Sequence, residues 1–252
     1  MITYGVKYMK FPYNIVKQVG NYKNTEPKKE MLFWSEEEFL KFIEAVDDKF
    51  FKLIFTSLYL TGMRKGEALA LTWGDIDFQR KEIKVAKSLN RKRPKKGGKV
   101  ILTSHLENPS NFGWHVSKTR SYEITTPKNR ASYRQILMPN NLYEMINEHY
   151  NLEKQCYGFS NNAFVFGGQV PVSDQTLRRR FNDFAKKAGV KIIRIHDLRH
   201  SYASLLINKG QNILIVSKRL GHSNITQTLN TYSHLMPNMQ LEIVEALNID
   251  IK

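Results

Sequence analysis

The stretch from Arg194 to His234 constrains the fold of this chain more than any other. It contains RIHDLRHSYA at 194–203, LGHS at 220–223 and TYSH at 231–234. Apolar residues recur between these motifs at helical spacing, first at Leu198, Tyr202, Leu205 and Leu206, and then, beyond Gly210, at Ile213, Val216 and Leu220. Two helices are therefore expected, with His196 and Arg199 three residues apart on one face, where a single ligand could contact both.

The residue types in this stretch suit a phosphate better than a metal ion. The histidines lack carboxylate or thiolate companions at ligand spacing, so the sequence predicts no metal site. Arginine suits a phosphodiester because its guanidinium is flat, donates several hydrogen bonds and is permanently charged. A tyrosine placed beside such a clamp could attack the phosphorus, with a neutral histidine taking the phenolic proton.

Five motifs in order resemble the tyrosine recombinases, or phage-type integrases. Three are HDLRH at 196–200, LGH at 220–222 and the tyrosine ten residues after His222. The segment TGMRKGEAL at 61–69 resembles the first-arginine motif of the family, and TPKNRASYRQI at 126–136 resembles the strand-turn-strand segment with its catalytic lysine. The resemblance covers roughly residues 32–240.

The resemblance implies six catalytic residues, which are Arg64, Lys128, His196, Arg199, His222 and Tyr232. The arginines would clamp the phosphate, Tyr232 would be the nucleophile and His196 its general base. His222 would donate a hydrogen bond to the phosphate, and Lys128 would protonate the departing 5′ oxygen.

Three further residues are expected to support the site. Glu67, three residues after Arg64, is expected to orient that arginine or to cap the following turn. His200 and His234 also match family positions, and both are interpreted as supporting or packing residues.

The implied function is site-specific DNA recombination, the integration or excision of a mobile element. Tyr232 would cleave a strand to give a 3′-phosphotyrosyl link and a free 5′ hydroxyl, and a second 5′ hydroxyl would religate it. No cofactor is implied, because the arginines supply the charge that a divalent ion would otherwise supply. Two alternatives stay open: relaxation like that of a type IB topoisomerase, and a DNA-binding fragment that is inactive without missing N-terminal domains.

The charge balance agrees with a nucleic-acid partner. Lys and Arg total 39 against 23 Asp and Glu, a formal charge of +16, which favours a polyanion such as double-stranded DNA. The resemblance implies a homotetramer on DNA, a chain that is mostly monomeric alone, and an accessory directionality factor. The single cysteine, Cys156, and the lack of a signal peptide or membrane span predict a cytoplasmic protein without a membrane partner.

The predicted fold class is α+β and mostly helical, a tyrosine-recombinase catalytic domain with a small antiparallel sheet at one edge. Residues 1–31 are interpreted as the remnant of a core-binding domain and its linker. Residues 32–252 form the catalytic domain and end in a tail helix at 238–248, with Leu241, Val244 and Leu247 on its apolar face.

Local patterns predict several elements of that domain. Ser35 and Glu38 form a capping box before a helix, and helices are expected at 49–60, at 142–157 and after Ser173. A hairpin is expected at 75–85, and residues 163–166 are expected to form a short buried strand or an extended piece. Strands 123–126 and 134–138 are expected to pair around Lys128. Residues 87–120, with the basic run 91–99, form either a solvated insertion or a phosphate-contacting segment.

Overall fold

The computed structural model describes residues 31–91, 122–126, 132–156 and 158–235. Lys128, the basic run from Lys92 onward and the predicted tail helix at 238–248 lie outside these ranges. The chain divides into two units, Met1–Met31 and Leu32–Lys252, and the elements named below all belong to the second. The assignment of residues 1–31 to a core-binding remnant stays a prediction.

Helix α3 (Glu36–Ala45) begins at the predicted capping box. Ser35 Oγ accepts a hydrogen bond from Glu38 N at 3.2 Å, and Glu38 Oε2 accepts one from Ser35 N at 2.8 Å. Two donors that the first helical turn would leave unpaired are thereby satisfied. The helix buries Phe39 and Phe42.

Helix α4 (Lys49–Thr61) is the centre of the second unit. It is buried on most faces, as its apolar run predicts, and packs against α3, α5 (Lys65–Leu69), α6 (Asn140–Glu153) and α8 (Asp197–Asn208). Asp48 caps its start by accepting hydrogen bonds from Phe50 N and Phe51 N. Gly62 ends it in the left-handed conformation, with φ 62°, and Arg64 is the N-cap of the next helix.

Aromatic side chains join α3 and α4 to α7 (Asp174–Lys187), whose start is capped by Ser173 as predicted. The Phe42 ring lies 4.7 Å from the ring of Trp34, 5.2 Å from Phe181 and 5.3 Å from Phe55, measured between centroids. All four residues are buried in the main hydrophobic core. Rings in these tilted and edge-to-face arrangements stabilise one another beyond the area they bury.

Two small antiparallel sheets complete the described part. The first has the order β1 (Ile76–Asp77), β2 (Glu82–Val85), β5 (Arg134–Leu137), and its β1–β2 pair is the predicted hairpin. The second pairs β3 (Ser88–Arg91) with β4 (Tyr122–Thr125). The segment 87–120, interpreted as an insertion or a phosphate-contacting segment, therefore begins with a strand.

The predicted pairing of 123–126 with 134–138 is wrong. β4 pairs with β3, with Leu89 opposite Ile124, whereas β5 pairs with β2, with Ile83 opposite Ile136. Ile83 and Ile136 are fully buried, while Ile124 is 49% exposed. The hydrophobic core therefore takes β5 into one sheet and leaves β4 in the other.

The remaining elements of the described part are helices α6, α9 (Ile213–Leu220) and α10 (Ile225–Tyr232), two 3-10 turns and the segment 163–166. Helix α6 ends at Glu153, earlier than predicted, and α9 begins after Gly210 as predicted. Helix α10 and the 3-10 turn Ser233–Leu235 follow, and another 3-10 turn spans Trp73–Asp75. Residues 163–166 form no regular strand, because Phe164 makes only isolated bridges, to Thr72 and Gly168.

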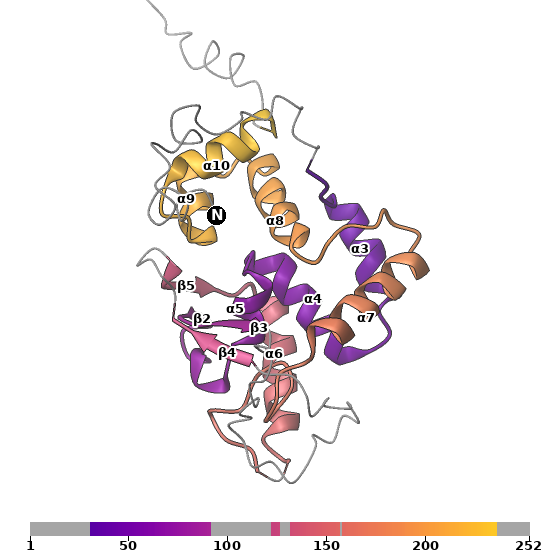
Figure 1. Cartoon of the computed structure of the whole chain (residues 1–252), viewed down its shortest axis with the longest axis vertical. Helices are drawn as coiled ribbons and strands as arrows, with labels where there is room; N and C mark the ends of the chain where they lie inside the picture. Colours follow the sequence, from indigo (N-terminus) through magenta and orange to yellow (C-terminus); the bar gives the residue numbers. More distant parts are fainter. Residues whose placement is uncertain (1–30, 92–121, 127–131, 157, 236–252) are drawn as a thin grey trace, which may run out of the picture. The chain divides into compact units, whose positions relative to one another are not determined.

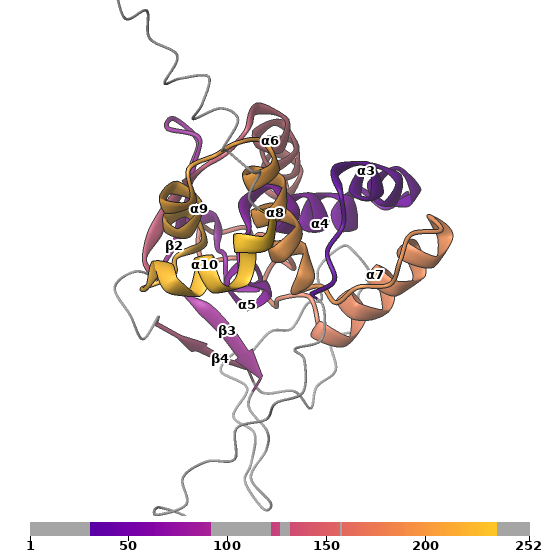
Figure 2. The same cartoon turned by 90° about the horizontal axis from the view of Figure 1, so that it is seen from above.

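Helices α8, α9 and α10 form one group beside α4 and α5. Figures 1 and 2 both show α9 and α10 next to α8, in agreement with the contacts among these three helices. Within the described residues, no helix is long and apolar enough to cross a membrane. This group brings the motifs at 196–200, 220–222 and 232 towards the start of α5.

The aromatic core gives a first testable prediction. Phe42→Ala should lower the free energy of unfolding by about 3–5 kcal/mol, because the deletion leaves a cavity among three packed rings. Leu40→Ala, on the same helix but 57% exposed, should change it by less than about 0.5 kcal/mol. Urea unfolding of both variants measures the difference, and equal destabilisation would contradict this description of α3.

Candidate active site

Five of the six predicted catalytic residues lie within the described part of the chain. They stand at helix ends or in the turns that join helices, except for Arg199, which lies inside α8. Arg64 is the N-cap of α5, His196 the N-cap of α8, His222 follows the C-cap of α9, and Tyr232 is the last residue of α10. Lys128 lies outside the described residues, so the structure does not place it.

The Arg199 guanidinium joins two of these turns. Its Nη1 donates to the carbonyl oxygen of Gly62 at 2.7 Å, and its Nη2 donates to the carbonyl oxygen of Leu220 at 2.7 Å. Gly62 precedes the Arg64 turn, and Leu220 precedes the His222 turn. A side chain that is buried, with 4% of the residue exposed, thus fixes the spacing between the two motifs.

Glycine is required at position 62 for two reasons. Its φ of +62° is one that other L-residues rarely adopt, and a Cβ there would lie 2.3 Å from Cδ1 of Tyr202. The ring of Tyr202 therefore covers the turn directly, and the carbonyl oxygen of Gly62 is held where Arg199 reaches it.

Glu67 connects Arg64 to a second arginine that the sequence analysis did not single out. Glu67 Oε2 accepts from Arg64 N and Oε1 accepts from Arg64 Nη1, at 2.8 and 2.7 Å, so Glu67 both caps the turn and orients the arginine. Arg134 on β5 donates to the same two oxygens, from Nη2 at 2.8 Å and from Nη1 at 3.2 Å. Arg134 Nε also donates to the carbonyl oxygen of Arg219, at 2.8 Å.

The charges of this cluster do not balance. The single carboxylate of Glu67 pairs with Arg64 and Arg134, while the nearby Arg199 guanidinium donates to backbone carbonyls instead. Burial and the neighbouring charges of Arg64 and Arg134 lower the pKa of Arg199 to about 9. Burial acts to raise the pKa of Glu67, but the hydrogen bonds and charge of Arg134 and the bonds from Arg64 outweigh it and lower that pKa. The surplus positive charge makes the cluster a site for an anion.

His222 is held as a neutral ring beside this cluster. Its Nδ1 lies 2.8 Å from Thr228 Oγ1, in hydrogen-bond contact. Burial, followed by the positive charges of Arg199, Arg64 and Arg134, lowers its pKa to about 4. The ring is therefore neutral at pH 7. In the tautomer whose Nδ1 accepts from the threonine, Nε2 carries a proton that can be donated to an anion.

Tyr232 is buried, with 1% of the residue exposed, and its hydroxyl contacts His200. The distance from Tyr232 Oη to His200 Nδ1 is 2.6 Å. Burial raises the pKa of Tyr232 to about 12, and the positive charge of Arg199 acts in the opposite direction. In the free chain the nucleophile candidate is thus a buried, neutral phenol.

His196 differs from the other two histidines because it is exposed. Burial of part of its ring, followed by the charge of Arg199, lowers its pKa. Its ring lies 5.4 Å from that of His200, edge to face. The charge of Arg199 thus acts on His196, as expected from their spacing, although His196 is exposed and Arg199 is buried.

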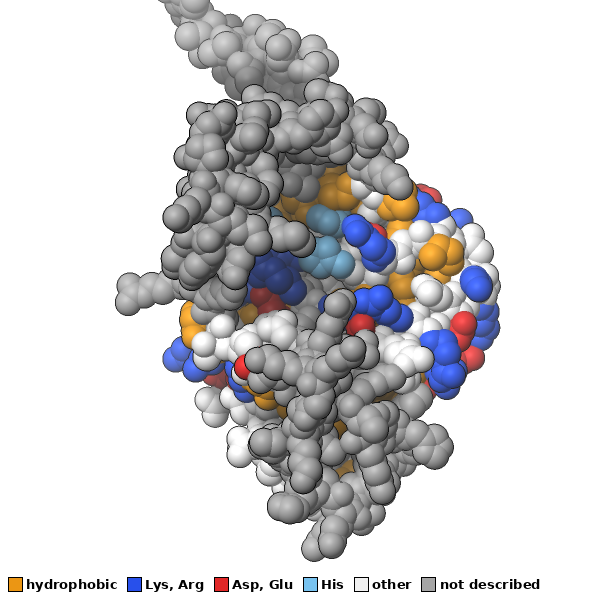
Figure 3. All heavy atoms as spheres, in the orientation of Figure 1, with side chains coloured by type: hydrophobic (Ala, Val, Ile, Leu, Met, Phe, Trp, Pro, Cys, Tyr) orange, Lys and Arg blue, Asp and Glu red, His pale blue; other side chains and the backbone are white. Residues whose placement is uncertain are grey.

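The site lies on one face of the second unit. Figure 3 shows histidine side chains grouped there, with Lys and Arg side chains beside them. Arg178 and Lys186 of α7 are also exposed, as expected from the basic pattern of that helix. Among the described residues, no group of three or more His, Cys, Asp or Glu is placed to hold a metal ion.

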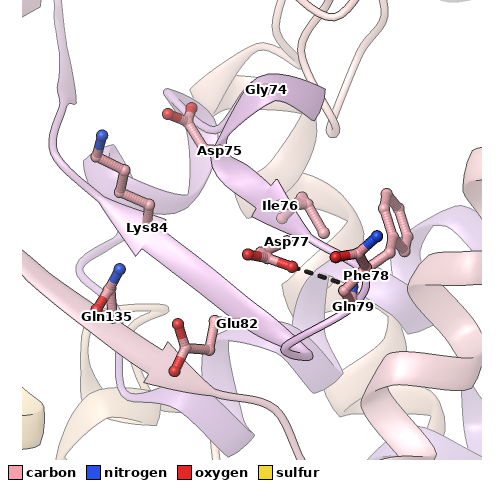
Figure 4. Close-up of a pocket in the computed structure, with 9 residues that line it drawn as sticks. All are labelled: Gly74, Asp75, Ile76, Asp77, Phe78, Gln79, Glu82, Lys84 and Gln135. Atoms are coloured by element: carbon pink, nitrogen blue, oxygen red, sulfur yellow. Dashed lines mark hydrogen bonds between the residues drawn. The ribbon is translucent and has the colours of Figure 1, made fainter.

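A pocket elsewhere on the structure is not part of this site. It has a volume of about 370 Å³ and lies on the first sheet, where Asp75, Asp77 and Glu82 contribute to its lining (Figure 4). Asp77 Oδ1 accepts hydrogen bonds from Gln79 N and Arg80 N, which closes the β1–β2 turn. Carboxylates of this kind repel a phosphate, so the pocket does not compete with the arginine cluster for an anion.

Sequence reasoning did not identify Arg134 as a site residue and gave His200 only a supporting or packing role. Arg134 lies six residues after Lys128 in the segment that carried the family resemblance. The sequence did not show that its side chain pairs with Glu67. His200 was interpreted as a packing or supporting residue, whereas its ring contacts the hydroxyl of Tyr232. The doubled histidine of the HDLRH motif is the only signal that pointed to it.

The buried ion pair gives a second testable prediction. Arg134→Met should lower the free energy of unfolding at pH 7 by about 3 kcal/mol, because it leaves Glu67 buried with one partner fewer. Arg80→Met, an exposed position, should change it by less than about 0.5 kcal/mol.

The same variant has a definite pH dependence. The pKa of Glu67 is lower in the folded state than its ordinary value of 4.5. Ionised Glu67 therefore stabilises the fold above pH 4.5, and this stabilisation is lost as the pH falls through the folded-state pKa. The difference between wild type and Arg134→Met, measured by urea unfolding, should therefore shrink below pH 4.5. A difference independent of pH would contradict the proposed ion pair.

Comparison with known proteins finds relatives among the integrases and tyrosine recombinases. The sequence matches the phage integrase family over residues 17–108 and 114–239. It is 31% identical to the ICEBs1 integrase of Bacillus subtilis (strain 168) over 229 residues, covering 88% of this chain and 55% of that protein. It is 30% identical to a XerC-like tyrosine recombinase of Caldanaerobacter subterraneus subsp. tengcongensis over 227 residues, covering 85% and 53%. The chain thus spans about half the length of these curated relatives.

Solved structures show the same fold. The Tn1549 transposon integrase in complex with transposon right end DNA superposes with a TM-score of 0.63 at 23% identity, covering 93% of this chain and 70% of that one. XerA recombinase superposes with a TM-score of 0.58 at 23% identity, covering 91% and 68%. The fold is therefore that of tyrosine-recombinase catalytic domains, mostly helical with small antiparallel sheets, and the chain belongs to the phage integrase family.

Proposed function

We propose that this chain performs the strand cleavage and religation of site-specific DNA recombination, integrating or excising a mobile element. The observation that carries the proposal is the arginine cluster, whose positive charges outnumber its single carboxylate. The guanidiniums of Arg64, Arg134 and Arg199 outnumber the single carboxylate of Glu67, and their charges act on neutral His222, while that of Arg199 also acts on Tyr232. A phosphodiester supplies the missing negative charge, and its transition state, with about one further charge, gains more from the cluster than its ground state does.

Each side chain has a part in the proposed reaction. Arg64 and Arg199 bind the non-bridging oxygens of the phosphate, although Arg199 first has to share its donors with two backbone carbonyls. His222 donates a hydrogen bond to the phosphate, and Tyr232 attacks phosphorus to give the 3′-phosphotyrosyl link. Religation by a 5′ hydroxyl reverses the step without an external energy source, because the ester keeps the bond energy.

Lys128 is the proposed general acid for the 5′ oxygen. A protonated group at this oxygen contributes about 10²–10⁴-fold to the rate, because an alkoxide is a poor leaving group. Arg134, six residues further on, joins β5 to Glu67 and to the carbonyl oxygen of Arg219. That anchor supports the proposal, because it ties the strand after Lys128 to the arginine cluster.

The proposed partner is double-stranded DNA. The excess positive charge of the chain and the exposed basic residues of α7 support contacts with phosphates. The similar Tn1549 integrase was solved in complex with DNA. The proposal includes a homotetramer on DNA, a mostly monomeric free chain, an accessory directionality factor and a cytoplasmic location. Residues 1–31 are proposed to end a core-binding domain, with residues 32–252 as the catalytic domain and its tail.

The relatives favour recombination over relaxation by a type IB topoisomerase. Those reported above are integrases and recombinases, and the relaxation reaction would use the same phosphotyrosyl chemistry. The two functions differ in whether a second DNA duplex supplies the attacking 5′ hydroxyl. Strand transfer to a second duplex would separate them.

Covalent trapping tests the proposed chemistry. The chain should form a denaturant-stable adduct with nicked suicide duplexes of randomised sequence, and Tyr232→Phe should form none while binding the duplexes as well as wild type. Tyr133→Phe, whose ring is 48% exposed, is the matched control and should retain the adduct. A chelator should leave the yield unchanged. Adduct formation by Tyr232→Phe at wild-type yield would remove the nucleophile from the proposal.

A sulfur-substituted substrate tests Lys128. Lys128→Ala should slow cleavage of the ordinary duplex by about 10²–10⁴-fold and should regain most of this rate when the bridging 5′ oxygen is sulfur, because a thiolate leaves without a proton. Lys84→Ala, an exposed lysine on β2, should cleave both duplexes as wild type does. If sulfur restores nothing, Lys128 is not the acid.

A further inference from the structure

We propose that His200, rather than His196, accepts the phenolic proton of Tyr232 during strand cleavage. The inference deepens the proposed function and rests on it. Family resemblance alone pointed to His196 as the base and left His200 as a supporting residue. The contacts in the structure reverse these two roles.

The geometry favours His200 directly. Its Nδ1 lies 2.6 Å from Tyr232 Oη, the distance of a short hydrogen bond between neutral groups, and the two ring centroids are 5.8 Å apart. His200 lies inside α8 and Tyr232 ends α10, so two helices hold the pair together. A base has to lie within hydrogen-bond reach of the proton that it takes, and His200 already does.

The charge state of His200 suits a proton acceptor. Burial, followed by the neighbouring His196 and the charges of Arg199 and Arg194, lowers its pKa to about 4 against the opposing effect of Asp197. The ring is therefore neutral at pH 7 and has a free lone pair. The titratable groups that face it are those four and His222, together with Tyr232 itself from α10.

The nucleophile needs such a base. With its pKa raised to about 12, only about one Tyr232 in 10⁵ is ionised at pH 7 in the free chain. The attack forms the bond from Oη to phosphorus, breaks the bond from phosphorus to the 5′ oxygen, and moves the phenolic proton to Nδ1 of His200. The 5′ oxygen leaves with a proton from the acid assigned to Lys128. In religation the protonated His200 returns its proton to Oη.

His196 fits a different role. It stands at the N-cap of α8, one turn before His200, and it is exposed. The hydrogen-bond partner that the structure gives to Tyr232 Oη is His200 Nδ1, and the ring of His196 meets the His200 ring edge to face. An exposed ring at the start of a helix, next to Arg199, is placed to contact the phosphate.

The competing role for His200 is that of a latch, which would only hold Tyr232 buried until DNA binds. The two roles predict opposite results when His200 is replaced. Removal of a latch frees the tyrosine and leaves cleavage as fast or faster. Removal of a base leaves the tyrosine without a proton acceptor and slows cleavage.

His200→Asn separates these roles most sharply. The asparagine amide occupies the position of imidazole Nδ1 and can hydrogen-bond Tyr232, but it cannot take up a proton at neutral pH. The substrate is the suicide duplex recovered from wild-type adducts out of the randomised pool, made with a bridging 5′ sulfur so that no acid is needed. His200→Asn should lower the single-turnover rate of adduct formation by about 10²–10⁴-fold with unchanged duplex binding.

Three further readouts follow the base itself. Added imidazole should restore part of the rate of His200→Ala and none of that of Tyr232→Phe. The wild-type rate should rise with pH only until His200 is deprotonated and then level off. The His200→Asn rate should keep rising with pH above that point. Nitrogen-15 NMR of the free wild-type chain should find Nδ1 of His200 unprotonated and Nε2 protonated, which needs no variant to fold.

The outcomes are distinct. A His200→Asn rate within threefold of wild type, no effect of imidazole, or a proton on Nδ1 in the free chain would overturn the assignment. Loss of cleavage in His196→Asn but not in His200→Asn would return the role to His196. Failure of the wild-type chain to form any adduct would instead refute the proposed function, and the inference with it.

Discussion

The site depends on one buried cation that is bound by backbone carbonyls. Arg199 donates to Gly62 at the end of α4 and to Leu220 at the end of α9, two places where a helix stops and leaves carbonyl oxygens without helical partners. Both stops need a glycine in the left-handed conformation, at positions 62 and 221. Because Arg64 and His222 follow those glycines closely, the position of each depends on the same guanidinium.

The cluster around Arg199 holds more positive charge than the fold can neutralise. Glu67 is shared by Arg64 and Arg134, which leaves the Arg199 charge compensated mainly by carbonyl dipoles. Repulsion among these neighbouring guanidiniums acts against the stability of the free protein, and a bound phosphodiester would relieve it. The same arrangement that costs stability therefore supplies binding energy, as is common where a fold is shaped by its site.

Local signals in the sequence were sufficient for the helices and for the order of the motifs. The capping box at Ser35, the glycine stop at Gly62 and the apolar stripe of α8 are all readable within a few residues of each feature. Strand pairing was not, because β3 and β4 are separated by about thirty residues, and proximity wrongly favoured a hairpin between β4 and β5.

The partners of the site residues are also distant in sequence. Arg134 meets Glu67 from 67 positions away, and His200 meets Tyr232 from 32 positions away. No periodicity links such pairs, so sequence motifs identified Arg64, Arg199 and Tyr232 but could not show which neighbours hold them. Lys128 lies outside the described residues, and its role still rests on resemblance and proposal.

Helix α10 has a consequence for the motions of the protein. It has only eight residues, whereas an isolated helix needs about 12–15 to persist in water, so its backbone order comes from its packing on α8 and α9. Segments of this kind open at a lower free energy than the core around α4, and their amide protons exchange sooner. The residue that would attack DNA thus stands at the end of one of the least self-sufficient helices of the domain, where exposing it requires only a local opening and not the unfolding of the whole.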